Sequence, residues 1–144
     1  MLFRSDPLLA FRLLADISLR ALSPAVNDPA TAVEAIDSLE GLLGLLAARA
    51  GRADQLADEA GAVRVVLSLP RWEDFARGSL DDLIAAAAGS PMVLLRLRDL
   101  LARLGEQAPA AGAGVVAARA AWVDDLLARE FPLIWPVMQD VLPE

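Results

Sequence analysis

Apolar residues recur at three- and four-residue spacing along most of this chain, which is the pattern of amphipathic helices. The pattern predicts five helices, spanning residues 7–22, 29–50, 72–88, 91–105 and 115–131. Proline or glycine stands at most of the boundaries between them, as is typical of helix ends. We therefore predict a mainly α fold, a bundle of about five helices that forms a single domain over residues 1–131.

The hydrophobic period changes between the second and third predicted helices. Val63, Val65 and Leu67 alternate with other residues in a two-residue period, which indicates a strand. Residues 58–61, Asp-Glu-Ala-Gly, precede it and are typical of a turn. This arrangement predicts a small two-stranded β-hairpin, whose first strand near residues 54–57 is only faintly indicated.

The first predicted helix is apolar on almost every side. Its charged residues Arg12, Asp16 and Arg20 recur at four-residue spacing and form one narrow stripe. A surface helix normally shows about half of its circumference to water, so this helix is either central in a bundle or covered by a partner. The stripe is interpreted as an exposed ladder of ion pairs, with a functional Arg/Asp site as the alternative.

A polar corner joins the first two predicted helices. Ser23 and Pro24 end the first helix, because proline disfavours helical geometry in the residue before it. Asp28 is the expected N-cap of the second, with a proline at the first helical position. Asn27 can both donate and accept hydrogen bonds. The corner is interpreted as capping and turn closure, and the alternative is an anion cradle at the helix N-terminus with Arg20 nearby.

Three pairs of adjacent acids occur at helix starts or on helix faces. Adjacent residues on a helix point about 100° apart, so none of these pairs is a preformed chelate. We interpret the first pair as favourable to the dipole of its helix and the other two as solvated faces. The pairs are Glu73-Asp74, Asp81-Asp82 and Asp124-Asp125.

The last 13 residues, 132–144, form an apolar tail that three prolines interrupt. The tail carries large apolar side chains that favour contact with another apolar surface, among them Ile134, Trp135 and Val137. We predict that it packs on the bundle or on a partner, and that Trp72, Trp122 and Trp135 are core or interface anchors rather than ligand-stacking platforms.

The amino-acid composition excludes several kinds of catalytic chemistry. The 144 residues include no Cys, His, Tyr or Lys, so all 13 basic residues are Arg. Thiolate nucleophiles, imidazole bases, catalytic triads and Schiff bases are therefore excluded within this chain. Carboxylates could still bind a divalent cation, so metal-assisted hydrolysis at Asp16 or Asp37 is a hypothesis beside the two that are given at the end of this subsection. An enzyme is disfavoured, and we expect no cofactor and no metal.

Net charge and hydropathy limit the kinds of partner that this chain is expected to bind. The net charge is −7 and no run of Arg occurs, so we expect no nucleic acid partner. Apolar residues make up 56% of the chain, yet no uncharged stretch reaches the roughly 18–20 residues of a membrane span. Charges also interrupt the N-terminal residues, unlike a signal peptide. We expect a soluble, intracellular chain whose excess apolar surface docks on something else.

Residues 11–32 read FRLLADISLRALSPAVNDPATA. This run resembles the pattern R-x-L-x-D-I-A-x-R-A-L-S-P-x-x-N-D-P-x-T-A of the bacterial predicted membrane proteins called domain of unknown function 2254. The resemblance implies transmembrane helices before this region and a place on the cytoplasmic side of the inner membrane. It implies no established activity. The candidate binding residues that it marks are Asp16, Arg20, Ser23, Asn27, Asp28, Thr31 and, in the continuation x-x-x-x-D-x-L of the pattern, Asp37.

Two functional hypotheses follow. In the first, the chain is an interaction or regulatory module whose partner is the membrane-embedded part of the same protein, another protein or a second copy. In the second, it is a small-ligand or divalent-cation-binding domain. The second requires Arg20, Asn27, Asp28 and Asp37 to converge on one pocket.

Overall fold

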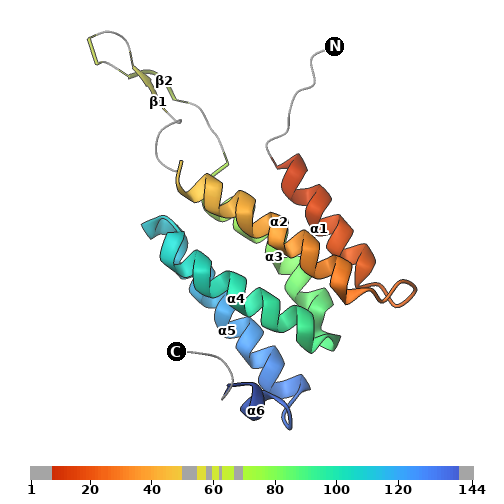
Figure 1. The fold of residues 1–144 in the computed structure, drawn as a ribbon. Coiled ribbons are helices and arrows are strands. Elements are labelled where there is room, and N and C mark those ends of the chain that lie inside the picture. Colours follow the sequence, from red (N-terminus) through yellow and green to blue (C-terminus); the bar gives the residue numbers. More distant parts are fainter. Residues whose placement is uncertain (1–7, 50–54, 58–59, 62, 67–69, 140–144) are drawn as a thin grey trace.

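The computed structural model describes residues 8–49, 55–57, 60–61, 63–66 and 70–139, and within these residues the chain is mainly helical (Figure 1). Proline at the first position of two of the helices and apolar residues at helical spacing account for where they form. The predicted mainly α bundle is therefore confirmed. The long helices are α1 (Leu9–Ala21), α2 (Pro29–Ala47), α3 (Trp72–Ala86), α4 (Pro91–Gln107) and α5 (Ala113–Glu130), followed by the short α6 (Trp135–Gln139).

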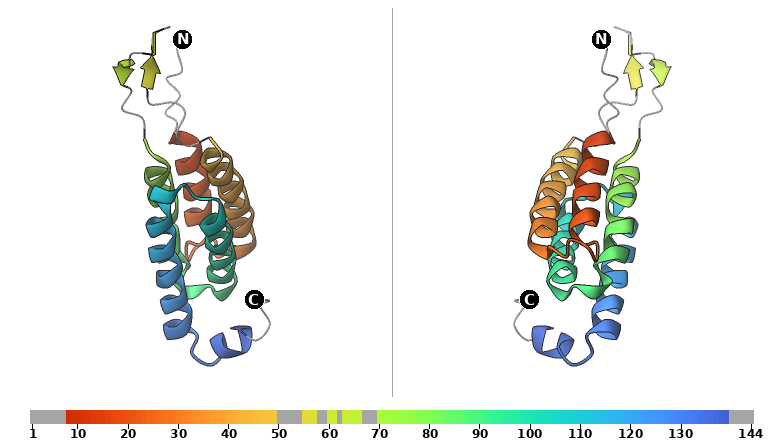
Figure 2. Two further views of the ribbon diagram at one scale, coloured as in Figure 1. Left: turned by 90° about the vertical axis from the view of Figure 1, so that its left-hand side faces the viewer. Right: turned by 90° about the vertical axis from the view of Figure 1, so that its right-hand side faces the viewer.

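The long helices run roughly along one common axis (Figure 2). α1 packs against α2 and α3, α2 also packs against α4, and α5 packs against α4 and α3. Two short strands, β1 (Gln55–Ala57) and β2 (Val63–Val66), lie in the sequence between α2 and α3 and pair antiparallel. Two single 3₁₀ turns, η1 (Ala87–Gly89) and η2 (Ala110–Gly112), precede α4 and α5.

One continuous apolar core runs through the bundle. The apolar residues at three- and four-residue spacing along α4 predict an inward face, and the six of them that form this face are all buried. α2 contributes Ile36, Leu39 and Leu43, and these are also fully buried. The residues from α4 are Val93, Leu94, Leu97, Leu100, Leu101 and Leu104.

Trp72 joins three elements at one end of the core. The residue is 4% exposed, and its indole Nε1 donates a hydrogen bond to the carbonyl oxygen of Leu43 at 3.0 Å. A Cβ placed on Gly112 would lie 2.6 Å from the Trp72 ring. The first residue of α3 is therefore wedged between the end of α2 and η2, and the close approach requires glycine at position 112.

Some local expectations need correction. α1 is not central, because Leu9, Leu13 and Ile17 are about half exposed on its outer side, and the other alternative, cover by a partner, stays a prediction. Trp122 is 37% exposed, so it is not a core anchor, and its role as an interface anchor stays a prediction. The third helix ends at Ala86 because the chain tightens into the 3₁₀ turn η1.

Two further predictions fall on residues that the structure leaves undescribed. The sequence predicts that Asp6 caps the first helix and that the second helix stops at Gly51, and both residues lie outside the described residues. The same holds for the part of the predicted second strand after Val66, residues 67–69.

Candidate functional site

The polar corner between α1 and α2 is organised around Asp28, the N-cap of α2. One carboxylate oxygen of Asp28 accepts a hydrogen bond from the backbone N–H of Thr31 at 3.1 Å. The other oxygen accepts one from the Thr31 hydroxyl at 2.6 Å. These two hydrogen bonds lower the pKa of the Asp28 carboxyl, because they favour its charged form. The backbone N–H of Asp28 donates to the carbonyl oxygen of Ala21 at 2.7 Å and ties the two helices together.

The backbone conformation of Asn27 helps to reverse the chain at the corner between α1 and α2. Its φ is +47°, in the left-handed region that asparagine adopts more readily than most residues. Its backbone N–H donates to the carbonyl oxygen of Ser23 at 2.8 Å. This local geometry accounts for a helix that ends, reverses and starts again within a few residues.

The seven candidate residues do not all lie together. Ser23, Asn27, Asp28 and Thr31 share the corner, whereas Asp16 and Arg20 are exposed on α1. The remaining residue is Asp37, which lies nine residues after Asp28, about 13 Å along the helix, and faces α4. In the part of the chain that the structure describes, no three carboxylates gather into a group that could hold a metal ion.

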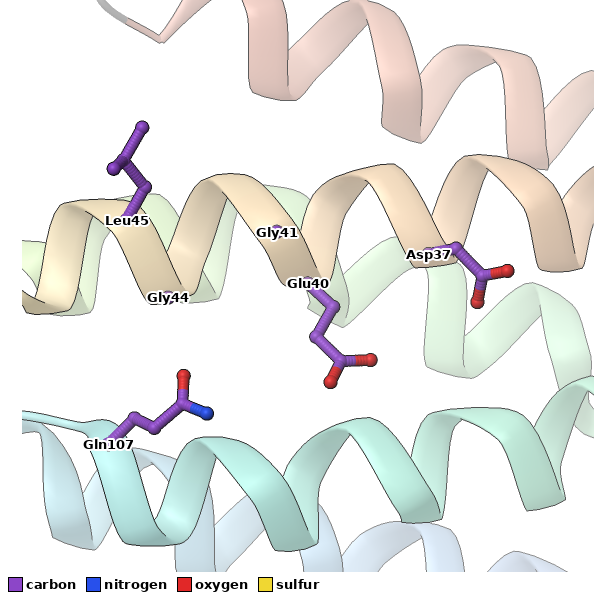
Figure 3. Close-up of a pocket in the computed structure, with 6 residues that line it drawn as sticks. All are labelled: Asp37, Glu40, Gly41, Gly44, Leu45 and Gln107. Atoms are coloured by element: carbon purple, nitrogen blue, oxygen red, sulfur yellow. The ribbon is translucent and has the colours of Figure 1, made fainter.

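Asp37 belongs instead to a cluster of charges between α2 and α4. Figure 3 shows Asp37 and Glu40 pointing from α2 toward α4. The Nε of Arg96 donates to Asp37 at 2.6 Å, and Glu40 accepts hydrogen bonds from both Arg96 and Arg103. Burial alone would raise the pKa of the Glu40 carboxyl, but the two guanidinium groups outweigh it and hold that pKa below its ordinary value. The cluster is therefore an ionised joint between two helices.

Sequence reasoning missed this cluster, although a signal for it was present. Asp37 and Glu40 stand three residues apart on one helix, and Arg96 and Arg103 stand seven apart on another. Both spacings keep side chains on one face of a helix. Only the packing of α2 against α4 shows that these two faces meet.

An open groove of about 510 Å³ lies beside the cluster (Figure 3). Gln107 reaches from the end of α4 toward Gly44, where a Cβ would lie 2.8 Å from the Gln107 Oε1. The two acids in the groove are already neutralised by arginines, so they offer little to a cation. The groove is lined by Asp37, Glu40, Gly41, Gly44, Leu45 and Gln107.

Two more inter-helix ion pairs correct part of the interpretation of the acid doublets as solvated, since one acid of each pair binds an arginine while its neighbour stays exposed. Arg119 of α5 binds both carboxylate oxygens of Asp81 of α3, each at 2.7 Å. Arg98 of α4 donates to Asp124 of α5 at 2.9 Å, and its guanidinium lies 5.2 Å from the ring centre of Trp135. Asp81 and Asp124 therefore fasten neighbouring helices, because arginines on those helices lie opposite them.

Two surfaces expose large apolar side chains. The first, here called the α1 row, consists of Leu9, Leu13 and Ile17, which are 49%, 53% and 45% exposed. The second, here called the α6 tip, consists of Leu133, Ile134 and Val137, and Leu133 is 89% exposed. Trp135 lies within the same stretch but is buried, so it anchors the tip to the bundle.

These features describe a helical domain in which ion pairs fasten neighbouring helices and which exposes two groups of three large apolar side chains. The chain belongs to the family of predicted membrane proteins called domain of unknown function 2254, whose profile it matches over residues 2–103. The match therefore takes in α1, α2, α3 and most of α4.

Uncharacterised proteins of Mycobacterium bovis and Mycobacterium tuberculosis are 31% identical to the chain over 103 residues. That alignment covers 72% of this chain and 20% of each relative, so the chain spans about a fifth of the length of these relatives. No solved structure matches the chain at a significant level. Among the helices in the described ranges, none is both long enough and apolar enough to cross a membrane.

Proposed function

We propose that this chain is a protein-interaction module of a bacterial membrane protein and that it acts by binding rather than by catalysis. Its partner would be the membrane-embedded part of the same protein, another protein or a second copy of itself. The cytoplasmic side of the inner membrane is the proposed location, following from the resemblance to the family. The observation that carries the proposal is the pair of exposed apolar surfaces.

Exposed apolar side chains are common when they are scattered, but grouped ones mark interaction sites. The α1 row places three large side chains at four-residue spacing on one side of a helix. The α6 tip places three more within five residues at the end of the bundle (Figure 2). Burial of such side chains contributes roughly 25 cal/mol per Å² of apolar surface, which favours association.

The polar candidates support the same proposal from the other direction. Asp28 and Thr31 satisfy each other, and Asp37 is held by Arg96. A small-ligand site would need several such groups pointing into one pocket. The side chains that the second hypothesis required are instead divided between the corner and the α2–α4 joint.

Site-specific photocrosslinking in bacterial cells tests the proposal. The photoreactive residue benzoylphenylalanine would replace Leu13 in the α1 row or Leu133 in the α6 tip of the whole chain. Both positions are exposed, so the replacement should leave the fold intact. We expect a discrete crosslinked product from at least one position, identified by mass spectrometry as a membrane protein or a second copy of the chain.

Glu106, exposed at the end of α4, is the matched control position and should give no discrete product. Products of equal yield at all three positions would indicate random collision rather than a docking surface. No product at either Leu13 or Leu133 would overturn the proposed function.

A further inference from the structure

The outer face of α1 carries two parallel rows of side chains. The α1 row is apolar, and beside it Arg12, Asp16 and Arg20 form a charged row with the same four-residue spacing. From 3.6 residues per turn, the two rows lie about 60° apart around the helix. All three charged residues are exposed, and the view that looks onto α1 shows the helix between α2 and α3 with its outer face uncovered (Figure 2).

Both rows are complementary to themselves when two copies of α1 run antiparallel. If Leu13 meets Leu13 of the second copy, Leu9 meets Ile17 of the second copy, so apolar groups face apolar groups. In that register Arg12 lies about 3 Å along the axis from Asp16 of the second copy, within reach of its long side chain. The two-fold symmetry of such a pair forms the same contact twice.

A parallel arrangement lacks this complementarity. In a parallel two-fold pair the symmetry axis runs along the helices, so the charged rows of the two copies lie on opposite sides of the apolar contact and Arg12 does not meet Asp16 of the second copy. The antiparallel pair is therefore favoured, because it places the two charged rows on the same side and brings opposite charges together.

We propose that the partner of the α1 row is a second copy of this chain, docked antiparallel on α1 with paired Arg12–Asp16 contacts. This inference rests on the proposed function, because it names the partner of one of the two interaction surfaces. Three half-exposed side chains supply only part of the roughly 800 Å² that each partner of a stable interface buries. The dimer is therefore a reversible one that grows with protein concentration.

Sedimentation velocity of the whole chain from about 1 to 300 µM measures this association. We expect the wild type to shift from monomer to dimer across that range. Leu13→Glu places a charge at the centre of the interface and should weaken association by about tenfold or more. Glu34→Arg, which reverses a charge on the α4 side of α2, should leave association unchanged.

Complementary charge reversals test the register directly. Arg12→Asp alone and Asp16→Arg alone should each fail to dimerise, because their own copies would repel. Mixed together, the two variants should form a heterodimer, because each Asp at position 12 or 16 then meets an Arg. Circular dichroism should show unchanged helix content in every variant.

A wild type that remains monomeric, or a Leu13→Glu variant that dimerises normally, would overturn the second-copy proposal. Failure of the mixed variants to associate would overturn the antiparallel register. The proposed function fails separately: a crosslink from position 13 to a different, identified membrane protein would support an interaction module while contradicting self-association.

Discussion

Single residues determine how closely the elements of this bundle approach one another. Trp72 occupies the space between α2 and η2, and Gly112 is the residue that leaves room for its ring. Neither role depends on helix propensity. Both arise from the shape of one buried aromatic side chain and from its hydrogen bond to Leu43.

Gly112→Ala should destabilise the chain by about 1–3 kcal/mol, because the added methyl group overlaps a ring that cannot move freely. Urea unfolding followed by circular dichroism measures the change. Gly114→Ala is the control, since a Cβ there meets nothing within 4 Å and the residue lies in α5. That variant should be equal to the wild type or up to about 1 kcal/mol more stable. Equal loss in both variants would contradict the overlap with Trp72.

Two substitutions test whether Asn27 stabilises the corner through its backbone conformation or through its side-chain amide. Asn27→Gly should keep the free energy of unfolding nearly unchanged, because glycine adopts a positive φ freely. Asn27→Ala should lose roughly 1–2 kcal/mol, because its Cβ disfavours the left-handed region. Thermal unfolding of both variants decides the point. If the glycine variant loses as much as the alanine variant, the side-chain amide is what the corner requires.

At the scale of the elements, local signals predicted well what depends on neighbours in sequence. Pro29 and Pro91 stand at the first turns of α2 and α4 in the structure, and Asp28 caps α2 as its position indicated. Contacts between segments that are distant in the sequence leave no local pattern from which they could be predicted. The exposure of the α1 row and the pairing of Asp81 with Arg119 depend on which helices become neighbours, and periodicity within one helix does not contain that information.

The same limit applies to the candidate site. The corner residues could be grouped from sequence because they follow one another within nine positions, from Ser23 to Thr31. Asp37 was grouped with them by resemblance, yet its partner Arg96 is 59 residues away. Its role follows from the packing of α4, which no local pattern reveals.

The joint between α3 and α5 should be worth more than an ordinary surface ion pair. Arg119 is 12% exposed and binds Asp81 with two parallel hydrogen bonds, a geometry that lysine cannot reproduce. Arg119→Lys should cost about 1 kcal/mol, and a double-mutant cycle with Asp81→Asn should give a coupling energy of at least about 0.5 kcal/mol. Arg129→Lys is the control, because its pair with Asp125 is exposed and should contribute less than about 0.5 kcal/mol. Equal effects at both sites would contradict the clamp.

For the molecule as a whole, the free energy of unfolding should depend on pH below neutrality through the protonation of carboxylates alone. The chain has no His and no Cys, the side chains that most often change charge near neutral pH. The free energy of unfolding should therefore be nearly constant between about pH 6 and pH 7. A slope in that range would reveal a strongly shifted carboxyl group elsewhere in the chain.

Below that plateau, stability should fall as the paired carboxylates take up protons. The ordinary pKa of Glu40 is 4.5, and its value in the folded chain is lower. The stabilisation from its charge is thus complete above pH 4.5 and is lost as the pH falls through the folded value. Glu40→Gln should cost about 1–3 kcal/mol at pH 7, because Arg96 and Arg103 lose their shared anion. Urea unfolding of both proteins from pH 7 to pH 3 should show this difference shrinking toward zero in acid. A difference that stays constant with pH would mean that Glu40 stabilises the bundle through its shape and hydrogen bonds and not through its charge.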